Sequence, residues 1–166
     1  MDVLTAIRTK RAVRQFTGDP IPEDVLEQIL RSALRSQSSK NTQPWQLIVV
    51  RDRATLEALS KTGDFLGHVA GAAVCVLFAA PNDSGWTWFD LGQCAAYLQL
   101  AAYGHGVGSC LGAIYRVDEA RELLGVPGEM ALHALVSLGY PSPEDRPAKM
   151  GGRKPLSDAV HWERWA

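Results

Sequence analysis

The stretch Ser36-Gln37-Ser38-Ser39-Lys40-Asn41-Thr42-Gln43-Pro44-Trp45 separates a helical pattern from the apolar run Leu47-Ile48-Val49-Val50. Eight of its first nine residues carry polar side chains, so we expect a surface loop between a helix and a strand. Ser, Asn and Gln side chains both donate and accept hydrogen bonds. Two interpretations remain open: the loop wraps the polar, uncharged edge of a ligand, or it is a solvated turn that ends a helix.

The segments on either side of this loop predict a helix and two strands. Pro22, Glu23 and Asp24 begin the helix, because proline and acidic residues are favoured in a first turn. Its core face repeats at helical spacing: Val25, Leu26, Ile29, Leu30, Ala33 and Leu34. After the loop we expect a strand at Gln46–Val50. The run Ala72–Ala80 is apolar on both faces, which is typical of a central strand covered by helices on both sides.

Further patterns complete an α+β prediction. An N-terminal helix capped by Asp2, with Val3, Leu4 and Ile7 on one face, precedes the helix that begins at Pro22. The other expected elements are helices at 54–61, 86–103 and 117–124, one or two helical turns within 63–71, and strands at 109–114 and 131–138. Helices and strands do not alternate regularly. This order favours a mainly antiparallel central sheet flanked by helices.

Composition predicts one soluble, cytoplasmic domain over residues 1–166. The length suits a single domain, and a formal net charge of −1 gives no strong attraction to nucleic acid or membranes. The longest apolar run, 69–80, is shorter than the ~20 residues of a membrane-spanning helix. The charged N-terminus does not resemble a secretory signal. Three scattered cysteines without a CxxC motif are typical of reduced thiols.

Several catalytic motifs are missing from the sequence. The four histidines, which we expect to be surface or capping residues, have no metal-ligand spacing, and neither a GxSxG elbow nor a Walker A motif occurs. The glycines of 104–112 follow a helix and do not fit GxGxxG. A Cys110–His105 nucleophile pair stays possible, but its spacing is not diagnostic. We therefore expect no resident catalytic residue and no metal, and any reaction would need an organic cofactor.

Two basic clusters suggest what that cofactor carries. One consists of Lys10, Arg11 and Arg14, and the other of Arg153 and Lys154. Clustered cations offer both charge and fork-shaped donors to a phosphate, although such a cluster can also be plain solvated surface. Together with the polar loop and the segment Leu111-Gly112-Ala113, they indicate a site for a flat, phosphorylated heteroaromatic ligand.

Four ordered motifs resemble the nitroreductase family of FMN-dependent oxidoreductases. They are Lys10-Arg11-Ala12-Val13-Arg14-Gln15-Phe16, the loop from Ser36 to Trp45, Gly106-Val107-Gly108-Ser109-Cys110-Leu111-Gly112, and a C-terminal region with Gly139-Tyr140-Pro141, Arg153-Lys154-Pro155-Leu156 and Val160–Trp165. The family usually has arginine at position 10, serine at 12 and proline at 37. This chain has Lys10, Ala12 and Gln37, and its span from Thr62 to Asp83 is short.

The resemblance implies a homodimer with two FMN sites at the interface, each built from both subunits. One subunit would contribute Lys10, Arg11 and Arg14, and the other would contribute Gln37, Ser38, Ser39 and Asn41. The other cofactor-binding residues that the resemblance implies are Ala12, Leu111, Gly112, Ala113 and Arg153. Lys10 or Arg11, with Arg153, would hold the phosphate. Arg14 would lie at the pyrimidine edge. Independently of the resemblance, the large apolar side chains of Trp162 and Trp165 predict that the tail docks on this subunit or on a partner.

The implied activity is ping-pong oxidation of NAD(P)H through FMN, with an electron-poor small-molecule acceptor such as a nitroaromatic or quinone. Neither nucleic acid nor a membrane is an expected partner. Two alternatives remain open from the sequence: an FMN-binding protein without turnover, and different flavin chemistry on the same scaffold. The acceptor and the choice between NADH and NADPH are also open.

Overall fold

The computed structural model describes residues 2–81, 83–146 and 152–165. Its helices are α1 (Val3–Thr9), α2 (Glu23–Ala33), α3 (Arg53–Leu59), α4 (Gly85–Gly104) and α5 (Val117–Leu124). Its strands are β1 (Gln46–Val50), β2 (Val74–Ala80), β3 (Gly108–Ala113) and β4 (Ala131–Gly139). Short 3-10 turns lie at Ser39–Asn41, Gly67–Val69 and Leu156–Asp158.

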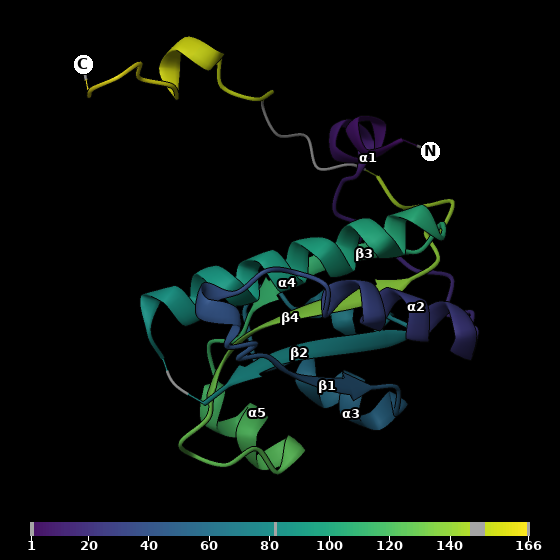
Figure 1. Cartoon of the computed structure of the whole chain (residues 1–166). Helices are drawn as coiled ribbons and strands as arrows, with labels where there is room; N and C mark the ends of the chain where they lie inside the picture. Colours follow the sequence, from purple (N-terminus) through teal and green to yellow (C-terminus); the bar gives the residue numbers. More distant parts are fainter. Residues whose placement is uncertain (1, 82, 147–151, 166) are drawn as a thin grey trace.

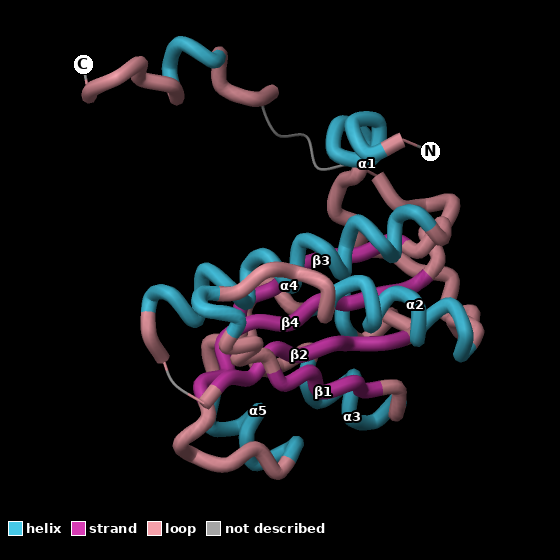
Figure 2. Tube along the Cα trace, in the orientation of Figure 1, coloured by secondary structure: helices cyan, strands magenta, loops and turns pink. Residues whose placement is uncertain are grey.

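The strands form one sheet in the order β1-β2-β4-β3, and every pairing within it is antiparallel. The sheet lies between two layers of helices, with α2 and α4 on one face and α3 and α5 on the other (Figures 1 and 2). This arrangement confirms the α+β fold with a mainly antiparallel sheet. β1 and β3 are the edge strands of the sheet.

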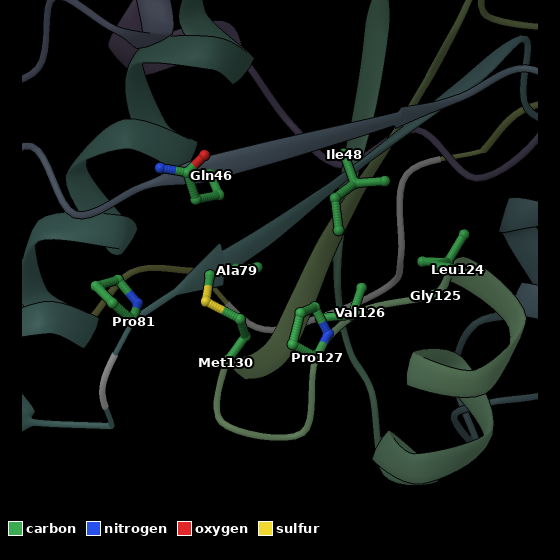
Figure 3. Close-up of a pocket in the computed structure, with 9 residues that line it drawn as sticks. All are labelled: Gln46, Ile48, Ala79, Pro81, Leu124, Gly125, Val126, Pro127 and Met130. Atoms are coloured by element: carbon green, nitrogen blue, oxygen red, sulfur yellow. The ribbon is translucent and has the colours of Figure 1, made fainter.

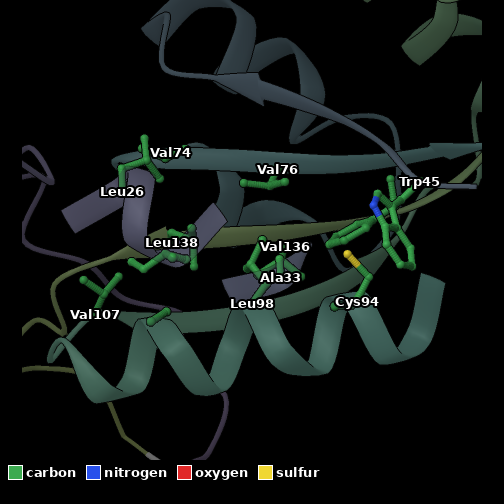
Figure 4. Close-up of a cluster of buried hydrophobic side chains, with 14 of the residues drawn as sticks. Leu26, Ala33, Trp45, Val74, Val76, Cys94, Leu98, Val107, Val136 and Leu138 are labelled. Carbon is green, nitrogen blue, oxygen red and sulfur yellow. The ribbon is translucent and has the colours of Figure 1, made fainter. Parts of the chain in front are cut away.

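β2 is central because its side chains are apolar on both faces. Val74, Val76 and Phe78 pack under α2 and α4, whereas Cys75 and Leu77 pack against α3, α5 and the turn Gly67–Val69. Figure 4 shows the first of these cores, in which Trp45, at the end of the polar loop, packs near Cys94 of α4. The loop is therefore anchored by its last residue to the core.

The N-terminal helix ends immediately before the basic motif. Asp2 caps α1 by accepting from Thr5 N–H over 3.0 Å, as predicted, but the helix ends at Thr9. The next residues run beside the sheet instead. Val13 N–H donates to Ser109 O (3.0 Å), and Thr17 N–H donates to Tyr140 O (3.0 Å). The motif 10–16 is thereby fixed next to the first half of β3.

The C-terminal segment 152–165 lies beyond α1 in Figure 1, away from the sheet. Its backbone bonds from Asp158, Ala159 and Val160 run within the segment. Trp162 and Trp165 are 74% and 85% exposed, so the chain itself does not bury them. None of the described helices combines the length and apolar character needed to span a membrane.

Candidate functional site

The basic cluster Lys10, Arg11 and Arg14 lies where the C-terminal end of α4 meets the start of β3. Lys10 Nζ donates to Gln99 Oε1 of α4, and burial lowers the pKa of this lysine. Tyr103 OH donates to Thr9 Oγ1 over 3.0 Å and holds the preceding turn. Arg11 and Arg14 are exposed. Of the three cations, the two arginines are the ones free to meet a ligand.

Asp145, which the sequence analysis missed, shapes this cluster. Its Oδ1 accepts from Arg14 N–H (2.9 Å) and from Gln15 N–H (3.0 Å). These bonds fix the backbone at Arg14 while its guanidinium stays at the surface. A cavity of about 280 Å³ lies beside them, lined by residues that include Lys10, Arg11, Ser109 and Asp145.

The edge of β3 offers unpaired backbone donors next to the basic cluster. Ile114 N–H donates to His133 O of β4 (2.8 Å), and inward and outward groups alternate along an antiparallel edge strand. The N–H groups of Leu111 and Ala113 therefore point away from β4. Within the described chain neither has a hydrogen-bond partner. The predicted segment 111–113 thus presents two donors to an open edge.

An apolar cavity of about 380 Å³ adjoins this edge, between α4 and the sheet. Its lining is Phe78, Trp88, Leu91, Gly92, Ala95, Ala96, Gln99, Leu111 and Ala134. Leu111 belongs to the β3 edge, and Gln99 holds Lys10, so the cavity joins the two predicted parts of the site. Its size and apolar walls suit part of a flat ring.

Gly112 has a packing role that the motif alone did not reveal. A Cβ added there would lie 2.2 Å from Leu66 Cδ2 and 3.5 Å from His68 Nε2. Glycine at this position therefore lets Leu66 and His68 pack directly under β3.

His68 is buried, which corrects the expectation that every histidine is a surface or capping residue. Its Nδ1 lies 2.8 Å from Ser137 Oγ, and Nε2 has no partner among the described residues. Burial, together with the positive charge of Arg14, lowers the pKa of His68 to about 4. His68 is therefore neutral at physiological pH. This burial was not predictable from the sequence, because residues 63–71 show no clear hydrophobic period.

The polar loop lies against the opposite end of α4. Gln37 Nε2 donates to Gln93 Oε1 (2.8 Å), and Ser39 N–H donates to Asp90 Oδ2 (3.0 Å). Ser38 Oγ accepts from Gln43 N–H within the loop (2.9 Å). Ser39 and Asn41 are exposed. The predicted loop residues are therefore presented outward by anchors on α4.

The loop backbone is strained at three positions. Lys40, Asn41 and Gln43 have φ values of 50°, 55° and 47°, in the left-handed region that non-glycine residues seldom adopt. Such conformations persist where surrounding contacts enforce them, and they are common at binding sites.

The basic cluster and the polar loop of the chain lie on opposite faces of α4. Gln99, which holds Lys10, and Asp90, which holds Ser39, are nine positions apart. At 3.6 residues per turn and ~1.5 Å per residue, they point in opposite directions and are separated by about 13 Å along the helix. The structure thus brings the basic cluster and the β3 edge together, but not the loop.

The other residues that the sequence analysis singled out lie in separate parts of the fold. Ala12 forms a bridge with Ser109 and belongs to the cluster. Arg153 lies in the exposed segment 152–165. Cys110 is buried, and burial raises the pKa of its thiol, which disfavours a nucleophilic thiolate. His105 lies at the exposed C-cap of α4.

A groove larger than these two cavities lies elsewhere among the described residues. It has a volume of about 510 Å³ and lies between β1 and the α5–β4 connection (Figure 3). Its walls include Ile48, Leu124, Val126 and Met130, and none of the predicted site residues lines it.

Comparison with known proteins identifies the chain's relatives. The model of the family described as "Nitroreductase family" matches residues 7–63 and 65–140. The chain belongs to the nitroreductase family. It is 31% identical to an NADH dehydrogenase of Thermus thermophilus (98% of this chain, 96% of the relative) and 27% identical to the nitroreductase NfnB of Mycolicibacterium smegmatis (95% and 91%).

A solved structure agrees with this assignment. The fold is similar to that of an FMN-dependent nitroreductase from Clostridium difficile, with a TM-score of 0.85, 25% identity and coverage of 98% of this chain and 100% of that one. The family resemblance inferred from the four motifs is therefore confirmed.

Proposed function

We propose that this nitroreductase-family chain is an FMN-dependent oxidoreductase that passes electrons from NAD(P)H to an electron-poor small molecule. The observation that carries the proposal is the position of Arg11 and Arg14 beside the free N–H edge of β3. A flavin mononucleotide needs cationic donors at one end and neutral hydrogen-bond partners along its ring, and this strip supplies both.

Each residue then has a role that follows from its chemistry. Arg11, with Arg153, would bind the phosphate, and Lys10 would add charge while held by Gln99. Arg14 would lie at the pyrimidine edge, where a cation stabilises negative charge. The N–H groups of Leu111 and Ala113 would donate to the ring edge. Bound FMN would supply two-electron chemistry, which no side chain of this site offers.

We further propose that the site is completed by a second copy of the chain. One protomer cannot bring its polar loop and its basic cluster to one ligand, because α4 separates them. Apolar side chains of α1 (Val3, Leu4 and Ile7) and of α4 (Trp86, Phe89 and Tyr97) are exposed. Such a surface suits a twofold interface that places the partner's loop at the cofactor.

In a site shared in this way, NAD(P)H and the acceptor would occupy the same exposed face in turn, which is a ping-pong scheme. The test is anaerobic addition of NAD(P)H to the purified yellow protein. Loss of the flavin absorbance, followed by its return on addition of a quinone or nitroaromatic, supports the proposal. A yellow protein that keeps its colour would instead be an FMN-binding protein without turnover.

A further inference from the structure

We infer that Asp90 is a positioning residue that holds the polar loop in its cofactor-binding conformation, an inference that rests on the proposed function. Asp90 lies on α4, 51 residues from Ser39 in the chain, and its Oδ2 accepts from Ser39 N–H over 3.0 Å. The side chain is only 3% exposed. This contact links the buried face of α4 to the loop residues that would face the flavin.

Among the described residues, Asp90 is the one acid whose side chain is buried. Within 2–81, 83–146 and 152–165, no Lys, Arg or His side chain forms an ion pair with it. Burying a carboxylate without a cation is unfavourable unless hydrogen bonds to it compensate. The backbone N–H of Ser39 is such a donor, and a charge-assisted bond is stronger than a neutral one.

The loop needs an anchor of this strength. Three of its residues have positive φ, and its internal bonds, Asn41 N–H to Ser38 O and Thr42 N–H to Ser39 O, are both 3.0 Å long. These local bonds fix the shape of the turn but not its place on the fold. Asp90 fixes the position of the loop relative to the rest of the fold, because α4, which carries Asp90, packs against α2 and the sheet.

The neutral bond from Gln37 to Gln93 is a weaker second tether. Both side chains are closer to solvent than Asp90, so water can replace their bond at little cost. Loss of Asp90 leaves Ser39 N–H without its acceptor and releases the strained turn. FMN would then have to order the loop on binding, and this cost lowers the affinity of the protein for FMN.

The experiment compares Asp90→Leu, which removes the acceptor at similar size, with Asp90→Asn, which keeps an amide oxygen for Ser39 N–H. We expect FMN affinity to fall about tenfold or more in Asp90→Leu and to be largely rescued in Asp90→Asn. Ile29→Val, a mild core change on α2, controls for lower stability and should bind FMN as the wild type does.

A readout without FMN separates this inference from the proposed function. Hydrogen exchange at Ser39 N–H in the apoprotein should speed up at least tenfold in Asp90→Leu and much less in Asp90→Asn. If the exchange rates change in this way but neither the wild type nor a variant binds FMN, the proposed function is wrong. The role of Asp90 in positioning the loop is then retained. Unchanged exchange and affinity in a folded Asp90→Leu protein would overturn the inference.

Discussion

The side chain of Leu66 fills the space in which residue 112 would carry a Cβ. An added Cβ would lie 2.2 Å from Leu66 Cδ2, far inside contact distance. Leu66 is fully buried in the core shared by α3, α5 and the sheet, so it cannot simply move aside. Gly112 therefore sets how closely the 63–69 segment approaches the β3 edge, and with it the position of the two free N–H donors.

Gly112→Ala should destabilise the protein by about 1–3 kcal/mol, because the methyl group overpacks this contact. Urea unfolding measures the change. Gly71→Ala is the matched control, since a Cβ there meets nothing within 4 Å. The double variant Leu66→Ala/Gly112→Ala should be more stable than the sum of the single effects indicates. Strictly additive effects would show that the two residues do not compete for space.

Protonation of His68 should destabilise the fold as the pH falls. Its pKa is about 4 when folded and 6.5 ordinarily, so between these values the unfolded chain binds more protons than the native one. Stability therefore rises with pH across this window and is lost as pH falls from about 6.5 toward 4, by up to about 3 kcal/mol.

Unfolding free energies of the wild type and of His68→Gln, measured from pH 7 to pH 4.5, test this expectation. The glutamine variant should lack most of the slope. His105→Gln, at the exposed end of α4, should keep it. A wild-type curve that is flat over this window would mean that His68 accepts a proton without cost in the folded protein.

The proposed dimer predicts that a charge on the exposed face of α1 separates the subunits. Leu4→Glu and Ile7→Glu place carboxylates on an apolar surface, so sedimentation velocity at micromolar concentration should shift from dimer to monomer. Leu123→Glu, on α5 at the other face of the sheet, should leave the dimer intact. A wild-type monomer that retains FMN would contradict the shared site.

Local pattern predicted most of the fold but little of what supports the site. The burial of α2 and of β2 could be predicted, because the helical spacing of apolar residues in α2 and the continuous apolar run of β2 are both visible among neighbouring residues. Asp90 appears in the sequence only as one polar residue in a helix. Its role depends on the hydrogen bond with Ser39, and a contact between residues 51 positions apart cannot be predicted from a local sequence pattern.

The burial of His68 and the role of Asp145 were missed for related reasons. His68 is buried by a 3-10 turn too short to show a period. Asp145 follows β4 in a proline-rich stretch that suggests only surface, yet it fixes the backbone of Arg14. By contrast the motifs pointed to the basic cluster and to 111–113, which the structure places near one another, although they could not show that α4 separates the cluster from the loop.

Neutral and charged contacts to FMN should respond differently to salt. Asn41 offers an exposed, uncharged amide, so Asn41→Ala should weaken binding by about 1–3 kcal/mol, nearly independently of salt. Arg11→Ala and Arg153→Ala remove charge-assisted contacts worth roughly 1.5–3 kcal/mol each. Their effect should shrink at high salt, because the ionic atmosphere screens charges exposed to solvent.

The measurement is FMN affinity by fluorescence titration of the apoprotein at low and high salt. Arg31→Ala, on α2 and paired with Glu27, is the matched arginine control and should bind FMN normally at both salt concentrations. Equal salt dependence in the Asn41 and Arg11 variants would remove the distinction between a neutral ring contact and a phosphate contact. No effect at Asn41 would reduce the polar loop to a solvated turn, because its strained backbone would then present nothing to the cofactor.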